Sequence, residues 1–155
     1  MSIEDFVIKF NAALDQSIHR AMEGNVTDAV KASIVSAIES EVYDKYKRSE
    51  DYPYIRRDET GAPGGLEDKD VMEATYDPST MTLEVQDMSR DDITGRLIAP
   101  VVESGKGYQW KRSTIYKTKQ ARPFHKEAQK IAVREDLVGA ALRAQLKEDG
   151  FDPKL

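Results

Sequence analysis

The stretch APVVESGKGYQW, residues 99–110, places a lysine between two glycines, and it is the first place to look for chemistry. A phosphate-binding Walker loop needs a glycine five positions before its Gly-Lys pair and a serine or threonine after the lysine. Here position 100 is a proline and position 107 is a glycine, so neither requirement is met. We therefore expect Gly105 and Gly107 to shape a chain reversal, with Lys106 between them.

Histidines and carboxylates show no catalytic or metal-binding pattern either. His19 and His125 are the only histidines, they fall on different predicted helices, and no third ligand accompanies them. The run Glu-Asp-Lys-Asp at 67–70 lacks the spaced oxygen ligands and the glycine of an EF-hand loop, so a solvated turn is the better interpretation. No serine has the G-x-S-x-G context, and there is no cysteine. We expect a protein that is not an enzyme and that holds no metal or cofactor.

A second stretch, residues 42–57, interleaves tyrosines with basic residues. Aromatic and basic side chains together can stack bases and contact phosphates. The alternative is structural: Tyr43 and Tyr46 would close the core face of a helix, while Tyr52 and Tyr54 would hold a loop. The structural interpretation is favoured because three acids in the same stretch would repel a phosphate backbone.

The net charge of −5 conceals a division of the chain. Residues 1–105 contain 11 Lys or Arg against 22 Asp or Glu, whereas residues 106–134, the basic segment, contain 9 against 1. Such a segment on an acidic body fits a nucleic-acid surface, a contact between one copy and the next, or only a solvated face. The candidate interface or DNA-channel residues are Lys106, Lys111, Arg112, Lys117, Lys119, Arg122, Arg56 and Arg57.

Hydrophobic periodicity predicts the elements that would position these residues. Apolar residues at steps of three and four from Ile3 to Met22 predict a helix that ends at Gly24. Thr27 is the predicted N-cap of a second helix, which runs to about residue 47 and packs on the first as a hairpin. Residues 49–66 contain two prolines and three glycines and predict a long loop, flexible or functional.

The second half predicts a hairpin and a terminal helix. Residues 71–76 and 80–87 alternate apolar and polar side chains around a turn at 77–79, and residues 113–119 predict a further strand. The last helix spans about 123–149: Pro123 suits its first turn, Phe124 begins its core-facing stripe, and Phe151 folds back beyond a left-handed Gly150. The expected fold is α+β, with two N-terminal helices and a long C-terminal helix packed on a small antiparallel sheet, in a single domain spanning 1–155.

Three pieces in this order resemble a known family: VYDKY…YPYIRRDETGAPGGLED (42–68), VVESGKGY (101–108) and ARPFHKEA (121–128). They resemble the tail-completion, or head-to-tail joining, proteins of long-tailed bacteriophages (siphophages) and prophages. In that family a VE-G segment precedes an RPF that opens the last helix. The resemblance covers about residues 40–150. The structural residues of the pattern are Glu103, Gly105, Gly107, Pro123, Phe124 and Gly150.

The resemblance implies a non-enzymatic structural protein of the phage neck. Several copies would form a ring at the end of the tail. The ring would bind the head connector or head-closure protein on one side and the tail tube or tail terminator protein on the other, with the passing DNA as a further contact. The resemblance also implies a place in the virion after synthesis in the host cytoplasm, and the sequence suggests no signal peptide and no membrane segment.

The alternative function is that of a small nucleic-acid-binding protein that uses the basic segment and the Tyr/Arg stretch. Duplex binding by the isolated monomer, with a steep salt dependence, would favour that alternative. A hydrolase with an unrecognised site has the least support of the three.

Overall fold

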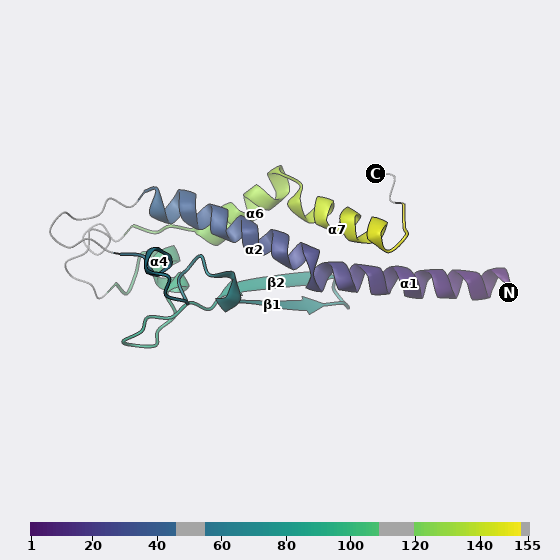
Figure 1. The fold of residues 1–155 in the computed structure, drawn as a ribbon, viewed down its shortest axis with the longest axis horizontal. Helices are drawn as coiled ribbons and strands as arrows, with labels where there is room; N and C mark the ends of the chain where they lie inside the picture. The colour runs from purple at the N-terminus through teal and green to yellow at the C-terminus, as the bar shows by residue number, and fades with distance from the viewer. Residues whose placement is uncertain (46–54, 109–119, 153–155) are drawn as a thin grey trace.

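The first helix, α1 (Ile3–Glu23), sets the long axis of the molecule, as Figure 1 shows. The structure is a computed structural model that describes residues 1–45, 55–108 and 120–152. The predicted span of α1 is confirmed. At its start, the Ser2 hydroxyl accepts from the Asp5 N–H at 3.1 Å and the Asp5 carboxylate accepts from the Ser2 N–H at 3.2 Å. This capping box satisfies N–H groups that the start of a helix leaves unpaired.

The second helix, α2 (Asn25–Ile38), continues α1 instead of folding back on it. Gly24 alone joins them, with φ −110° and ψ −105°, and Figure 1 shows the two helices end to end. The predicted helical hairpin and the predicted N-cap at Thr27 are both wrong. A single connecting residue is too short to reverse the chain between two helices. The Thr27 hydroxyl instead donates to the Met22 carbonyl at 2.6 Å, which ties α2 to the end of α1.

A π-helical turn, η1 (Glu39–Tyr43), extends α2 toward its predicted end. Residues 46–54, where that end and the start of the predicted loop fall, lie outside the described residues. The described remainder of the predicted loop contains one short helix, α3 (Arg57–Thr60).

The predicted β-hairpin is confirmed. A 3₁₀ turn, η2 (Lys69–Val71), leads into β1 (Met72–Asp77), which pairs antiparallel with β2 (Thr82–Asp87). The register places Met72 opposite Asp87 and Tyr76 opposite Leu83. The Asp77 carboxylate holds the turn by accepting from the N–H of Ser79 at 2.9 Å. Successive side chains in a strand alternate between faces, and the buried or half-buried residues of β2 are accordingly Leu83, Val85 and Asp87.

The predicted C-terminal helix over 123–149 is divided in two. After the short helix α4 (Ala99–Ser104), the chain forms α6 (Phe124–Arg134) and then α7 (Leu137–Glu148). The break is at Asp136, whose φ of 50° is left-handed. Aspartate is one of the few residues besides glycine that adopt this conformation readily, so no glycine marks the break in the sequence. The change of direction lets α6 pack on α2 while α7 packs on both α1 and α2.

The end of α7 has the Schellman geometry that the sequence predicts. Gly150 has φ 88°, its N–H donates to the Lys147 carbonyl at 3.1 Å, and the Phe151 N–H donates to the Leu146 carbonyl at 2.8 Å. Phe151 then meets the Phe10 ring edge-on at 5.7 Å between centroids. This ending returns the chain to the side of α1.

The last turn of α7 is also fixed to α1 by polar contacts. The Asp149 carboxylate accepts from the Ser17 hydroxyl at 2.5 Å and pairs with the Arg20 guanidinium at 2.9 Å. These bonds hold the pKa of Asp149 below its usual value.

The core lies at the end of the molecule away from the N-terminus. Its buried side chains come chiefly from α2, α4 and α6 and include Ile34, Ile38, Val102, Phe124 and Ile131. Residues 1–13, by contrast, are all exposed. Helices packed on a small antiparallel sheet make the fold α+β, as predicted, although the predicted strand at 113–119 lies outside the described residues.

Candidate functional site

The segments VVESGKGY (101–108) and ARPFHKEA (121–128) are bonded to each other. The Glu103 Oε1 atom accepts the backbone N–H of His125 at 2.7 Å and lies 3.0 Å from its Nδ1. The Arg122 backbone N–H donates to the Val102 carbonyl at 3.1 Å. These bonds hold the end of α4 against the start of α6. We call this contact the motif junction.

The start of α6 explains why a glutamate is needed at the motif junction. The N-cap of α6 is Pro123, which offers no side-chain oxygen to the N–H groups of the first turn. The Glu103 carboxylate, brought from α4, accepts one of them and places a negative charge at the positive end of the helix dipole. The adjacent Phe124 is fully buried, at 0 % exposure. The RPF segment therefore fixes the helix start by both packing and hydrogen bonding.

The glycines next to Glu103 form the turn that leaves α4. Gly105 and Gly107 have φ of 66° and 84°, both in the left-handed region. The Gly107 carbonyl accepts from Arg96 Nη1 at 3.2 Å, and a Cβ at position 107 would lie only 2.7 Å from Arg96 Nη2. Lys106 is exposed on this turn. The segment is a chain reversal packed against an arginine.

Buried polar groups lie near the motif junction, and the sequence reasoning did not single them out. Asp87 and Ser89 are 4 % and 1 % exposed, and Asp87 Oδ1 accepts the Ser89 N–H at 2.8 Å. Burial raises the pKa of Asp87, while the hydrogen bonds of Ser89 and the nearby His125 oppose that rise. The alternation of β2 was the signal that could have found Asp87, because it continues the inward positions of Leu83 and Val85.

The described candidate residues of the basic segment do not all reach the surface. Lys106 does, but Arg122 is only 5 % exposed, so its assignment to an interface or DNA channel is wrong. Arg122 lies close to Tyr108: burial raises the pKa of the Tyr108 hydroxyl, and the positive charge of Arg122 opposes that rise. Lys111, Arg112, Lys117 and Lys119 lie outside the described residues.

Arg56 and Arg57 serve contacts within the chain. The Arg56 guanidinium lies 3.7 Å from the centroid of the Tyr43 ring, and Arg57 donates to the carbonyls of Gly64 at 2.6 Å and Arg90 at 2.8 Å. Both side chains are only 20 % exposed. These contacts favour the structural interpretation of the described part of the Tyr/Arg stretch, and the assignment of Arg56 and Arg57 to an interface or DNA channel stays a prediction. Tyr46, Tyr52 and Tyr54 lie outside that part.

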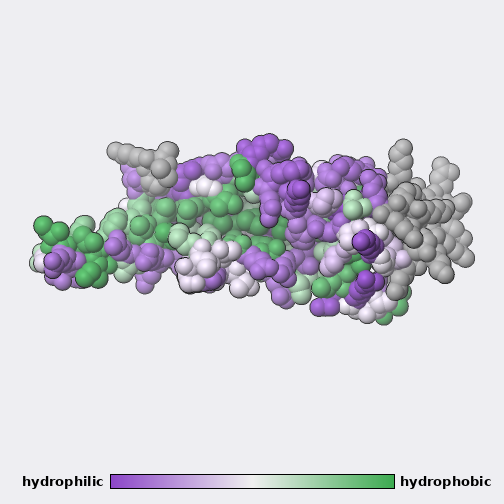
Figure 2. Space-filling view, turned by 180° about the vertical axis from the view of Figure 1, so that it is seen from behind, coloured by the Kyte–Doolittle hydropathy of each residue, from purple (hydrophilic) through white to green (hydrophobic). Residues whose placement is uncertain are grey.

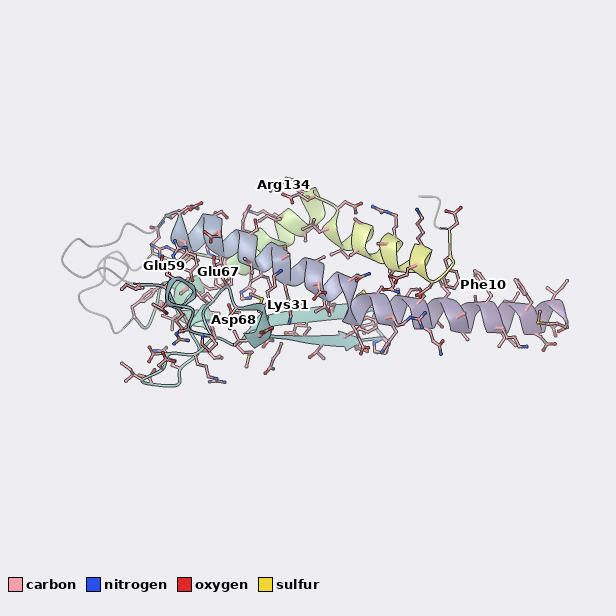
Figure 3. All side chains as sticks on the ribbon, viewed as in Figure 1. Phe10, Lys31, Glu59, Glu67, Asp68 and Arg134 are labelled. Carbon is pink, nitrogen blue, oxygen red and sulfur yellow. The ribbon has the colours of Figure 1, made fainter. Side chains whose placement is uncertain are left out.

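A row of basic residues on α6 was missed as a site. Lys126, Lys130 and Arg134 are exposed and follow one another at steps of four, which places them on one face of the helix. Figure 3 shows Arg134 at the outer side of α6. Lys130 pairs with Glu127 at 2.7 Å and Arg134 with Glu135 at 3.0 Å. Their spacing within the basic segment was the signal that could have identified them.

The acidic run at 67–70 and the two histidines serve contacts within the chain. Among the residues that the structure describes, no three His, Cys, Asp or Glu side chains are grouped so as to hold a metal ion. The Asp68 carboxylate, from the acidic run at 67–70, accepts the N–H groups of Gly64 at 2.7 Å and Asp70 at 3.0 Å, and these bonds lower its pKa. It stabilises a turn. His19, on α1, lies 3.2 Å from Glu23, whereas His125, on α6, lies 3.0 Å from Glu103. The described helices include none with the length and apolarity to cross a membrane.

The motif junction and the free end of α1 lie at opposite ends of the molecule. In Figure 1, α4 is at one end and the N-terminus at the other. Figure 3 likewise places Glu59, Glu67 and Asp68 near the α4 end and Phe10 on the projecting helix. The chain therefore presents two chemically different ends, one beside the basic segment and one carrying exposed apolar side chains.

Comparison with known proteins identifies a family. No curated protein and no solved structure matches the chain. The family model described as YomN matches residues 7–148, from the first turns of α1 to the end of α7. Because this match covers most of the sequence and both segments of the motif junction, the chain belongs to the phage-associated YomN family.

Proposed function

We propose that the chain is a structural protein of the phage neck, without enzymatic activity, and that copies of it form a ring that completes the tail and joins it to the head connector. The observation that carries this proposal is the motif junction. The two segments that most resemble head-to-tail joining proteins are separate in sequence, yet Glu103 and His125 bond them into one unit. A phage-associated family is consistent with this role.

The charge distribution supports a ring of identical subunits. A ring closes through head-to-tail contacts, in which one surface of a subunit meets a different surface of the next. The exposed basic row on α6 and the exposed Lys106 give the chain a basic surface, whereas residues 1–105 carry twice as many acidic as basic residues (22 against 11). Basic and acidic surfaces on one chain fit such contacts and set their orientation.

The decisive experiment removes the protein from a phage that encodes it. The gene is inactivated in an inducible prophage, and the lysate is examined by electron microscopy with and without the wild-type gene supplied in trans. We expect filled heads and separate tails without the protein, and joined infectious particles when it is restored. Joined particles in its absence would refute the proposal.

DNA binding is the second candidate function. The composition of the basic segment favours it, because the segment contains 9 basic residues and 1 acidic residue. Duplex binding should be measured on the isolated protein over a series of salt concentrations. A role in DNA binding predicts affinity that falls steeply with salt, because each neutralised phosphate releases counterions. We expect weak binding instead, since Arg56, Arg57 and Arg122 are engaged or buried.

A further inference from the structure

The N-terminal half of α1 carries an apolar stripe that the described residues leave largely exposed, with Phe151 touching it only at Phe10. Ile3, Phe6, Val7 and Phe10 share one face of the helix by their spacing, and their exposed fractions are 84, 54, 47 and 45 %. Phe6 stacks on Phe10 at 6.2 Å between ring centroids, and Phe10 touches Phe151. Four large apolar side chains are therefore exposed together on one helix face.

The covered half of the same helix shows what this stripe is suited to. Farther along the stripe, Ser17 and Ala21 are completely buried at 0 % exposure, where α7 and the hairpin pack on α1. The uncovered part continues the same pattern for about three turns beyond them. Helices of this length are marginal without tertiary packing, because most helical stability in proteins comes from burying an amphipathic face. Packing against a partner molecule would stabilise this half of α1 in the same way.

A second apolar surface lies on the body of the molecule. Figure 2 shows apolar surface continuing from the α1 end over the middle of the body, between polar rims. Half-buried apolar residues of the elements there include Leu14, Ile18, Leu83, Val85 and Leu142. Contiguous apolar patches of this kind with polar rims are typical of protein interfaces. The end of α1 points away from the body, so it cannot cover this surface in its own molecule (Figure 1).

We propose that residues 3–13 of α1 pack against the apolar body surface of a second copy of this chain. One such contact covers both apolar surfaces, whereas a foreign partner on either surface would leave the other bare. The contact joins two different surfaces, so its repetition generates a ring when the rotation between copies closes and a filament when it does not. The stripe offers roughly 500 Å² on the helix side. The contact as a whole would then remove about 1,000 Å² from water, the lower bound for a specific interface.

This inference rests on the proposed ring and names the element that builds it. The first test compares Phe6→Glu with a matched control, Ile8→Glu, on the opposite face of the same helix, where Ile8 is 68 % exposed. Sedimentation velocity on the full chain, over a concentration series, measures self-association. We expect Phe6→Glu to weaken self-association about tenfold to a hundredfold, because it replaces a phenyl ring that would be buried in the contact by a charge. Ile8→Glu should change self-association far less.

Two results of this test would overturn the inference. One is a wild-type chain that stays monomeric at the highest concentration it tolerates. The other is equal weakening by the two variants, which would show that charge on the helix and not the stripe matters. Circular dichroism and thermal unfolding of each variant verify that both remain folded, which is expected because both positions are exposed.

A cross-link then locates the contact on the second copy. The chain contains no cysteine, so Val7→Cys introduces a unique thiol for a photoactivatable cross-linker. Mixing labelled protein with isotopically heavy unlabelled protein lets mass spectrometry separate links between copies from links within one. We expect capture of α7 or the hairpin of the heavy copy. Capture of residues 1–13 of the heavy copy would mean that like ends pair, and would refute the head-to-tail contact.

The particle assay separates failure of this contact from failure of the neck function. If Phe6→Glu supports joined particles while deletion of the gene does not, the α1 contact is wrong and the neck function stands. If deletion itself leaves particles joined, the neck function fails, and the sedimentation and cross-linking results still decide whether α1 binds a second copy.

Discussion

Replacing Phe124 by alanine tests whether the RPF segment is a structural part of the core. Phe124 is 0 % exposed, packs in the main core with residues of α2 and α4, and has its ring 4.4 Å from that of His125. Its backbone opens α6 beside the Glu103 hydrogen bonds, so the surroundings have little freedom to collapse into the space that the ring leaves. A Phe→Ala change at such a site costs about 3–5 kcal/mol, combining lost burial with a residual cavity.

The assay is urea unfolding followed by circular dichroism, with the midpoint and slope fitted for each protein. A loss of this size would be a large part of the total stability of an ordinary domain, about 5–15 kcal/mol. Val133→Ala is the matched control, because Val133 lies on the same helix at 82 % exposure, and we expect it to change stability by less than about 0.5 kcal/mol. A loss below about 1 kcal/mol for Phe124→Ala would refute the core role of the RPF segment.

Four further predictions address the site and its surroundings. Glu103→Ala removes the acceptor of the His125 N–H and should cost about 0.5–2 kcal/mol in urea unfolding, as losing a helix cap does; an unchanged midpoint would contradict the motif junction. Gly105→Val forces a β-branched residue to φ 66° and should cost at least about 1–2 kcal/mol, with a lower melting temperature. Asp87→Asn should stabilise the protein at neutral pH. Burial raises the pKa of Asp87 in the folded state above its unfolded value of 3.8, so the wild-type protein loses stability as the pH rises through the folded pKa. The stability gained by the variant should therefore vanish in acid, where Asp87 is protonated in both states. Reversing Lys117 and Lys119 to Glu should reduce the yield of joined particles in a plaque and microscopy assay, and a normal titre would count against a role for the basic segment.

Local sequence signals predicted several elements correctly because neighbouring residues decide them. The hairpin follows from the alternation around Asp77 and its turn, and the Schellman ending follows from Gly150 and the apolar Phe151. The span of α1 follows from its apolar periodicity and ends at Gly24 as predicted. Each of these signals acts within a few residues, so it can be recognised without knowledge of the tertiary packing.

The errors arose where the direction of the chain or the burial of a polar group depended on distant residues. Gly24 was expected to reverse the chain, but it only joins two helices that continue in line. Asp136 breaks the last helix without a glycine or proline to announce it. Arginine is usually a surface residue, so the sequence predicted an exposed Arg122. Its burial follows from the packing of the RPF segment beside α4, and hydrophobic periodicity does not reveal that packing.

The contacts at the end of α7 have a consequence for the geometry of an assembly. Ser17, Arg20 and Phe10 on α1 are held by Asp149 and Phe151, so the last residues of the described chain set the angle at which α1 projects. In a ring joined through that helix, the projection angle determines the rotation between neighbouring subunits and hence how many subunits close the circle. Ser17, Arg20 and Asp149, which lie outside the contacting residues 3–13, would then govern the diameter of the opening.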